Sequence, residues 1–168
     1  METPIAVANY FIKKALDDGT PVTSMKLLKL TYIAHGWYLG LTQGEPLLNE
    51  GVEAWKYGPV IPSLYHTLKS NGYANVTRLQ STWGPDMQPI TPQIQQPTLP
   101  QFLDKIWEIY SKYDGLQLSA LTHQENTPWS ITWHKKGGKD MMGSVIPNHL
   151  IGVHYQEMLA KSKEKNAA

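Results

Sequence analysis

Residues 53–65 of the chain read Glu-Ala-Trp-Lys-Tyr-Gly-Pro-Val-Ile-Pro-Ser-Leu-Tyr, with three large aromatic residues, a Gly-Pro pair and a second proline close together. The alternation over residues 53–57 predicts a short, half-buried strand. Gly58-Pro59 is expected to end that strand, because proline removes a donor from the ladder. Pro62 can open a helix, where its missing N–H is no loss. The stretch therefore predicts a strand, a tight turn and the start of a helix.

The aromatic residues at this corner, Trp55, Tyr57 and Tyr65, allow two interpretations. They can form core packing around the turn, since aromatic side chains dominate core energetics. They can also be presented to a partner protein, because Trp and Tyr carry much of the binding energy of interfaces. The two interpretations are compatible if some of the rings are buried and others are exposed.

Hydrophobic residues upstream of this stretch repeat at the spacing of helices. One helix is predicted over residues 5–18. A longer helix, capped at residues 23–24, runs to about residue 42, and its apolar stripe is wide enough for burial on more than one side. We interpret Gly36 and Gly40 inside it as places where another helix can come close.

Downstream, Leu47-Leu48 is expected to pair with the strand of residues 53–57 as a small hairpin. Five further helices are predicted. The first covers residues 62–70, and the second runs from Thr98 or Pro100 to Asp114-Gly115. The third is capped by Ser119, the fourth is a single turn from Pro128, and the last begins at Pro147-Asn148. The expected fold class is mainly α. It consists of a single compact domain over residues 1–168, with six or seven helices and a minor β-hairpin.

Residues 74–100 differ in composition from the rest of the chain. Five prolines lie between Pro85 and Pro100, with glutamines among them. We expect an irregular excursion with short extended pieces near Val76 and Ile90. A loop of this length inside a domain is usually functional or mobile, so it is a candidate for a partner-binding arm or a disordered insert. The charged tail, residues 161–168, is expected to fray.

Composition describes an ordinary globular protein. The chain has 168 residues, 41% of them hydrophobic and 17% charged, which favours one domain with a sizeable core. Six tryptophans and nine tyrosines stand against two phenylalanines, so most rings have a polar group that suits an interface. The absence of cysteine excludes disulfides, thiolate metal sites and cysteine nucleophiles.

Charge argues against nucleic acid as a partner. The net charge is +1, and Arg78 is the only arginine, although arginine makes the commonest bidentate base contact. The N-terminus lacks the basic start and apolar core of a signal peptide. No apolar run approaches the roughly 20 residues of a spanning helix. We therefore expect a cytoplasmic protein that does not contact the membrane.

The sequence shows no set of residues that points to a metal, cofactor or catalytic site. His149 and His154 are five residues apart and fall on different faces of a helix. His123 with Glu125 would supply only two ligands. No phosphate-binding loop and no nucleophile elbow is present. His35, within the second helix, is expected to be hydrogen-bonded or exposed.

His123 is the one histidine whose neighbours invite a second interpretation. A small hydrolase would need a nucleophile such as Ser119 and an orienting carboxylate to converge on it. The alternative is a histidine that is hydrogen-bonded near a helix start. Both interpretations stay open at the level of sequence.

Several blocks along the chain together resemble one family. They are Trp55-Lys56-Tyr57-Gly58-Pro59-Val60 with Tyr65, the helical block from Leu27-Leu28-Lys29-Leu30 to Leu39, Leu118-Ser119 with Thr122-His123, Pro128-Trp129, and Ile146-Pro147-Asn148 with Leu150-Ile151. This pattern resembles the Panacea domain of SocA-like antitoxins, a family also labelled phage-associated (GepA-like). The excursion before residue 101 has no counterpart in the pattern.

The resemblance implies an antitoxin of a bacterial or prophage toxin–antitoxin system, not an enzyme, that neutralises a protein toxin by direct contact. Some SocA-like members deliver the toxin to a Clp-type protease. The residues expected to contact the partner, or to shape that contact, are Trp55, Lys56, Tyr57, Gly58, Pro59, Tyr65, His123 and Trp129. A DNA-binding regulator of its own operon and a small enzyme centred on His123 are the alternatives, and the oligomeric state is open. We hypothesise that the excursion sets the choice of toxin.

Overall fold

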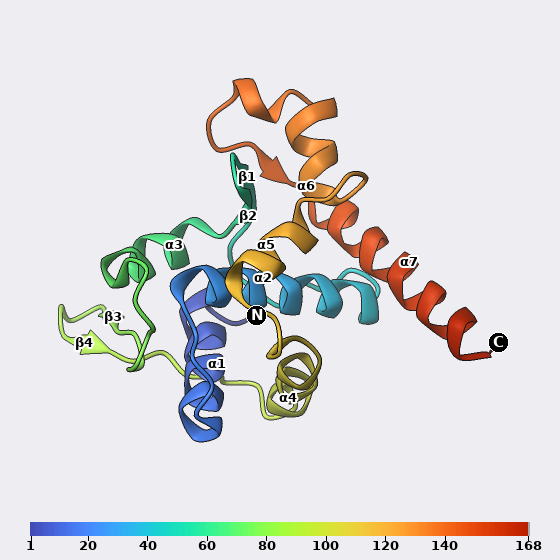
Figure 1. Cartoon of the computed structure of the whole chain (residues 1–168). Coiled ribbons are helices and arrows are strands. Elements are labelled where there is room, and N and C mark those ends of the chain that lie inside the picture. The colour runs from blue at the N-terminus through green and yellow to red at the C-terminus, as the bar shows by residue number, and fades with distance from the viewer. Residues whose placement is uncertain (168) are drawn as a thin grey trace.

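The computed structural model describes residues 1–167 and shows a mainly α-helical protein, as the sequence predicted (Figure 1). Its helices within these residues are α1 (Pro4–Asp18), α2 (Ser24–Leu41), α3 (Pro62–Leu68), α4 (Leu99–Tyr110), α5 (Gly115–Thr122), α6 (Pro128–Ser130) and α7 (Asn148–Ala167). Short helical turns follow α3 (η1, Lys69–Asn71) and α6 (η2, Ile131–Lys135, and η3, Gly138–Asp140). The strands are β1 (Val52–Trp55), β2 (Gly58–Val60), β3 (Thr82–Trp83), β4 (Pro89–Ile90) and β5 (Val145–Ile146).

Helix α2 lies at the centre, with α1, α3, α4, α5 and α7 packed around it (Figure 1). The side chains of Leu27, Leu30 and Ile33 are fully buried. Thr23 caps the helix, because its hydroxyl accepts the N–H of Lys26 at 3.2 Å. The expected burial of this helix on more than one side is therefore confirmed.

Two glycines of α2 let helix α7 come close, as the sequence indicated. A Cβ at Gly36 would lie 2.1 Å from the Tyr155 ring of α7, and a Cβ at Gly40 would lie 3.0 Å from Tyr155 Cβ. The Tyr155 ring is buried edge-to-face against Trp37, with 5.1 Å between centroids. Helix α7 then continues to Ala167 across the segment expected to fray, and residue 168 lies outside the described residues.

The hairpin around residues 53–60 differs from the prediction. Strand β1 ends at Trp55, Lys56 and Tyr57 form the turn, and Gly58-Pro59 begins β2 instead of ending a strand. Proline is tolerated because β2 is an edge strand of the sheet β2-β1-β5, so its missing N–H leaves no partner unpaired. Gly58 has φ of 123°, which favours glycine.

The predicted pairing of Leu47-Leu48 with β1 is wrong. Strand β1 instead pairs with β2 on one side and with β5, from the far end of the chain, on the other. Leu48 forms a bridge with Glu2 near the N-terminus. Local sequence pattern carries no information about a strand partner some ninety residues away.

The boundary between α4 and α5 also differs from the prediction. Asp114 caps the start of α5 rather than the end of α4: its carboxylate accepts Gln117 N at 2.8 Å, and Gln117 Oε1 accepts Asp114 N at 2.9 Å. Gly115 is the first residue of α5, and a Cβ there would lie 3.0 Å from Lys26 N of α2. Ser119 lies inside α5 rather than at its cap.

His35 is fully buried and hydrogen-bonded, one of the two outcomes that the sequence allowed. Leu48 N donates to Nδ1 at 3.4 Å, and Nε2 lies 3.1 Å from Asn148 Oδ1, which suits a neutral ring with the proton on Nε2. Burial lowers the pKa of His35 below its usual value, and the Asn148 bond opposes this only in part. The ring ties α2 to the segment before β1 and to α7.

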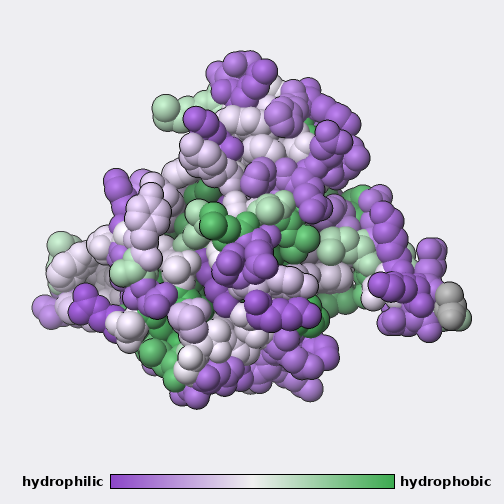
Figure 2. All heavy atoms as spheres, in the orientation of Figure 1, coloured by the Kyte–Doolittle hydropathy of each residue, from purple (hydrophilic) through white to green (hydrophobic). Residues whose placement is uncertain are grey.

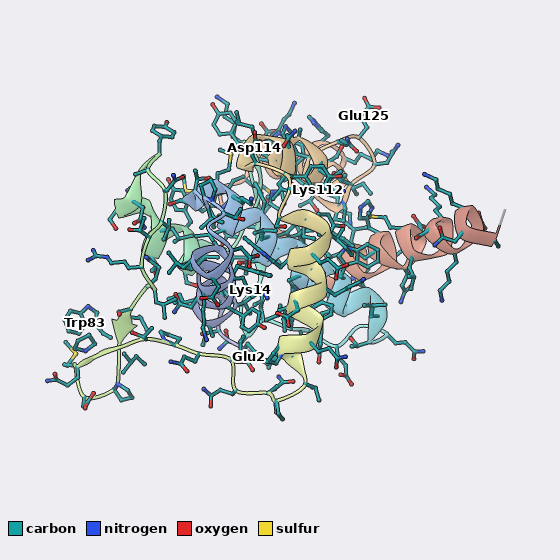
Figure 3. The ribbon with its side chains drawn as sticks, turned by 60° about the horizontal axis from the view of Figure 1, so that its bottom comes forward. Glu2, Lys14, Trp83, Lys112, Asp114 and Glu125 are labelled. Carbon is teal, nitrogen blue, oxygen red and sulfur yellow. The ribbon has the colours of Figure 1, made fainter. Side chains whose placement is uncertain are left out.

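The excursion between η1 and α4 carries the β3–β4 hairpin, which we call the arm (residues 82–90). Asn9 of α1 holds its base: Nδ2 donates to Gln80 O at 2.9 Å and to Pro92 O at 3.0 Å, and Oδ1 accepts Gln80 N at 2.7 Å. Trp83 lies on the arm, away from the helices (Figure 3). The path of the excursion is therefore anchored at its base and free at its tip.

A second anchor holds the end of the excursion. The buried Glu2 carboxylate accepts the backbone N–H groups of Gln95 and Gln96, each at 2.9 Å.

No helix among residues 1–167 combines the length and the apolar character needed to cross a bilayer.

Candidate partner-binding groove

The turn of the β1–β2 hairpin is held by side chains from three different helices. The bonds are Trp129 Nε1 to Trp55 O (2.6 Å), Ser119 Oγ to Tyr57 O (3.2 Å) and Lys29 Nζ to Pro59 O (2.9 Å). These donors come from α6, α5 and α2, which are far apart in the sequence. Two strands alone would be only marginally stable, so the bonds from these helices fix the hairpin in place.

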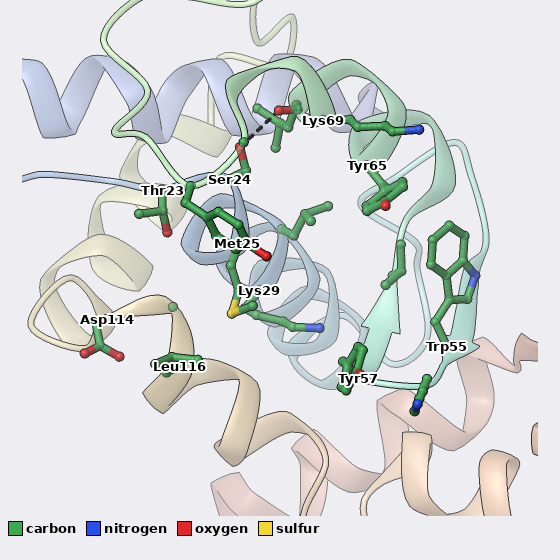
Figure 4. Close-up of a pocket in the computed structure, with 17 residues that line it drawn as sticks. Thr23, Ser24, Met25, Lys29, Trp55, Tyr57, Tyr65, Lys69, Asp114 and Leu116 are labelled. Carbon is green, nitrogen blue, oxygen red and sulfur yellow. Dashed lines mark hydrogen bonds between the residues drawn. The ribbon is translucent and has the colours of Figure 1, made fainter.

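Beside the hairpin lies a hollow of about 950 Å³, which we call the groove (Figure 4). It is bounded by the start of α2, the β1–β2 hairpin, α3 with η1, and the start of α5. Much of its wall is apolar and comes from Met25, Leu28, Trp55, Tyr65, Leu68 and Leu116. A hollow of this size and lining is typical of a binding site.

The aromatic residues of the hairpin are partly buried and partly exposed. Trp55 and Tyr65 are half-buried and pack edge-to-face, 4.9 Å between centroids. Trp55 Nε1 donates to Glu53 Oε2 at 2.7 Å on the same face of β1. Tyr57 is 69% exposed, with the Lys56 ammonium over its ring at 5.4 Å. Core packing and exposure to solvent therefore coexist at this corner.

The rim of the groove carries large side chains that are open to solvent. Tyr73 is fully exposed, and Leu116 is 73% exposed. Figure 2 shows hydrophobic side chains gathered over α5 near the middle of this face, between hydrophilic ones. Exposed apolar groups that cluster around a hollow mark interaction sites more often than scattered ones do.

Lys29 lies at the floor of the groove. Its residue is only 4% exposed, and burial lowers the pKa of its ammonium to about 8. Figure 4 shows the side chain extending from α2 toward the hairpin. Lys56 and Lys69 also line the groove, against one carboxylate, Asp114. The lining is therefore apolar with an excess of positive charge.

His123 and Trp129 lie behind the hairpin and do not line the groove. The His123 Nδ1–H donates to the backbone carbonyl of Ser119, while the Ser119 hydroxyl donates to Tyr57 O. The His123 ring packs edge-to-face on the buried Trp129 ring, 5.2 Å between centroids. The serine and the histidine are thus not joined as nucleophile and base, the contact that the enzyme alternative requires.

The sequence interpretation selected Trp55, Lys56, Tyr57 and Tyr65, and the structure brings these four together at the groove. Gly58 and Pro59 are buried in β2, where Gly58 faces Lys29 and Pro59 accepts its bond. Within residues 1–167, nowhere do three or more His, Cys, Asp or Glu side chains gather as they would around a metal ion.

Sequence reasoning missed several groove residues, among them Lys29, Tyr73 and Leu116. A signal existed for Lys29, because a lysine within a helix that is buried on several sides is unusual. Tyr73 and Leu116 gave no such signal, since each stands at a turn or a helix start.

A second hollow, of about 610 Å³, lies across β1 from the groove. Trp133 and the exposed Met141 and Met142 line it, and Trp55 and Lys56 border both hollows. The hairpin therefore forms a ridge between two hollowed surfaces.

Comparison with known proteins identifies one family. A family model described as "Antitoxin SocA-like, Panacea domain" matches residues 27–130, from α2 to α6. Over 148 residues the chain is 30% identical to "Antitoxin SocA" of Caulobacter vibrioides (strain NA1000 / CB15N), which covers 87% of this chain and 78% of that protein. No solved structure matches significantly. Residues 27–130 include the β1–β2 hairpin, the three side chains that hold it, and the groove lining except Thr23, Ser24 and Met25.

Proposed function

This chain belongs to the SocA-like antitoxin family with the Panacea domain, and from that premise we propose that it neutralises a cognate protein toxin by binding it directly. The groove beside the β1–β2 hairpin is the contact surface in this proposal. The partner is the toxin, and the bound toxin surface is the one on which its activity depends.

One observation carries the proposal. Tyr57, Tyr73 and Leu116 are exposed at the rim of a largely apolar hollow, and Tyr57 stands on a hairpin whose backbone carbonyls are held by side chains from three helices. Aromatic side chains on a rigid scaffold lose little conformational entropy on binding. The rim is therefore suited to anchor a protein surface.

Neutralisation can proceed by covering the toxin or by delivering it to a Clp-type protease. The two routes differ in what happens to the toxin after binding. Covering leaves the toxin at a constant level in the cell, whereas delivery shortens its half-life. A blot of toxin after synthesis is stopped, in cells with and without Clp protease, separates the two routes.

The test is a co-expression rescue. The neighbouring reading frame is induced with and without this protein, survivors are counted, and the tagged protein is purified from rescued cells with its partner. We expect relief of toxicity together with a stoichiometric complex. A harmless neighbour, or rescue without a complex, would contradict direct neutralisation.

A matched pair of variants locates the contact. Leu116→Asp places a charge in the rim at the start of α5, where a carboxylate suits the helix dipole and should not disturb folding. Leu16→Asp changes a leucine on α1 that is also solvent-facing, at 50% exposed, and lies outside the groove. We expect loss of rescue for Leu116→Asp alone. Equal rescue by both variants would mean that the toxin binds elsewhere.

A further inference from the structure

The floor of the groove contains a buried positive charge that its apolar walls do not explain. Lys29 Nζ has three N–H donors, and the structure pairs it with one acceptor, Pro59 O at 2.9 Å. Among residues 1–167 it forms no ion pair, since the ion pairs there join Lys14 to Asp104 and Lys105 to Glu108. Burying an ammonium without a counter-charge costs folding free energy, so we expect Lys29 to have a function at this binding surface.

Gly58 makes room for this ammonium. A Cβ at Gly58 would lie 2.8 Å from Lys29 Nζ. Any residue larger than glycine at position 58 would therefore crowd the ammonium, and it would also strain the backbone, whose φ there is 123°. The hairpin thus brings a carbonyl to one side of Lys29 and leaves no side chain of its own at residue 58.

The other charged side chains that line the groove also give it an excess of positive charge. Lys56 lies at the turn of the hairpin and Lys69 in η1, and both line the groove with Lys29. The one carboxylate in the lining, Asp114, is engaged by Gln117 N in the cap of α5. Three ammonium groups spread through an apolar hollow complement a segment that carries several carboxylates between apolar side chains.

We propose that the groove takes an acidic, apolar segment from within the partner's chain, with one Glu or Asp side chain paired to Lys29 Nζ. This rests on the proposed function, because the partner is the toxin. A segment within the chain is preferred over a C-terminus, since terminal carboxylates are usually held by nests of backbone N–H groups and the neighbour of Lys29 is a carbonyl. Binding replaces the missing counter-charge, so the pair becomes stronger as the segment excludes water.

Blocked peptides test this chemistry without the toxin. Ac-Leu-Glu-Trp-Leu-NH2, its Gln analogue, and the Gln analogue with a free C-terminal carboxylate are titrated into the full-length protein, and amide shifts of Lys29, Gly58 and Leu116 are followed by NMR. We expect the Glu peptide to bind at least about tenfold more tightly than the Gln peptide. Equal binding, or strongest binding by the free-acid peptide, would overturn the proposal.

A second arm uses the complex with the toxin. Lys29→Met removes the charge and keeps an apolar side chain of similar length, and Lys13→Met is the matched control on the exposed surface of α1. We expect Lys29→Met to weaken toxin binding by about 30-fold or more with little change in Tm, because removal of the buried charge offsets the loss of the bond to Pro59 O. The Lys13→Met variant should bind as the wild type does.

The outcomes separate the two proposals. Rescue and tight binding by Lys29→Met would overturn the role of Lys29 and leave the antitoxin function standing. A neighbour that the wild type does not neutralise would instead remove the antitoxin function, and the Glu and Gln peptides would still decide the chemistry of the groove.

Discussion

The β1–β2 hairpin and the β3–β4 arm each expose one aromatic ring, Tyr57 and Trp83, both at 69%. They differ in how they are held. Three side chains from three helices bind the carbonyls around the β1–β2 turn, whereas Asn9 and Glu2 hold the excursion at its base and leave the arm projecting from the body (Figure 3). The two hairpins are thus similar in local structure, but the turn of the first is bonded to the helical core and the tip of the second is not.

The two hairpins tolerate change to different degrees. A change that moves the backbone of the β1–β2 turn, such as an insertion, disturbs its bonds to α2, α5 and α6 at once, so its cost falls on the whole protein. A substitution at the arm's tip touches little else. The arm can therefore vary while the groove is kept, which agrees with our hypothesis that the excursion sets the choice of toxin.

The largest effect is expected at Trp129, which supports the hairpin from behind. Trp129→Ala removes a buried ring and the bond to Trp55 O, and we expect a loss of about 3–5 kcal/mol in the free energy of unfolding. Trp83→Ala is the matched control on the arm, with an expected change within about 0.5 kcal/mol. Urea denaturation measures both. Similar losses in the two variants would contradict the contrast drawn between the hairpins.

A smaller effect is expected at the base of the arm. Asn9→Ala leaves Gln80 N–H, Gln80 O and Pro92 O without their partner, at a cost of about 1–3 kcal/mol. Hydrogen exchange should rise in residues 80–96 and remain unchanged in residues 52–60. Faster exchange in both regions would show that the arm and the hairpin open together, against the separation that the contacts indicate.

The smallest effect is a dependence of stability on pH that comes from the buried His35 of α2. Burial lowers the folded-state pKa of His35 below 6.5, so the unfolded chain binds the proton more readily. Its contribution to stability is complete above about pH 6.5 and is lost as the pH falls below that value. Burial also lowers the pKa of His154.

Thermal unfolding between pH 8 and pH 5 measures this slope, and His35→Gln, which does not titrate, should reduce it. His154→Gln controls for the second histidine. A slope that His35→Gln leaves intact would assign the pH dependence to other groups.

Much of the helical fold could be predicted from the sequence. Apolar spacing and capping residues located α1, α2 and α7 because these signals act within a few residues. Gly36 and Gly40 indicated the close contact that Tyr155 makes. The Asp114-Gly115 pair misled, since the same two residues can end one helix or begin the next; here the Asp114–Gln117 capping box and the packing of Gly115 on α2 make them the start of α5.

The sequence interpretation selected Trp55, Tyr57, Tyr65 and Lys56 of the candidate site and missed Tyr73, Lys29 and Lys69. Trp55, Tyr57 and Tyr65 attracted attention by residue type alone, and they do meet at the groove. Whether each ring is exposed depends on neighbours from α3, α5 and α6, which residue type does not reveal. Lys29 was quoted only as part of a motif, because its burial beside Gly58 follows from the position of the hairpin.

The helical class, the corner rich in aromatic residues and the small residues that allow close packing can be read from the chain alone, because they follow from periodicity, side-chain size and local backbone preference. The partner of β1, the support of the hairpin and the burial of Lys29 depend on the assembled fold. The reason is distance along the chain: the three bonds at the hairpin join residues separated by 30, 62 and 74 positions. Such contacts form only when the whole core is assembled, so no local pattern specifies them.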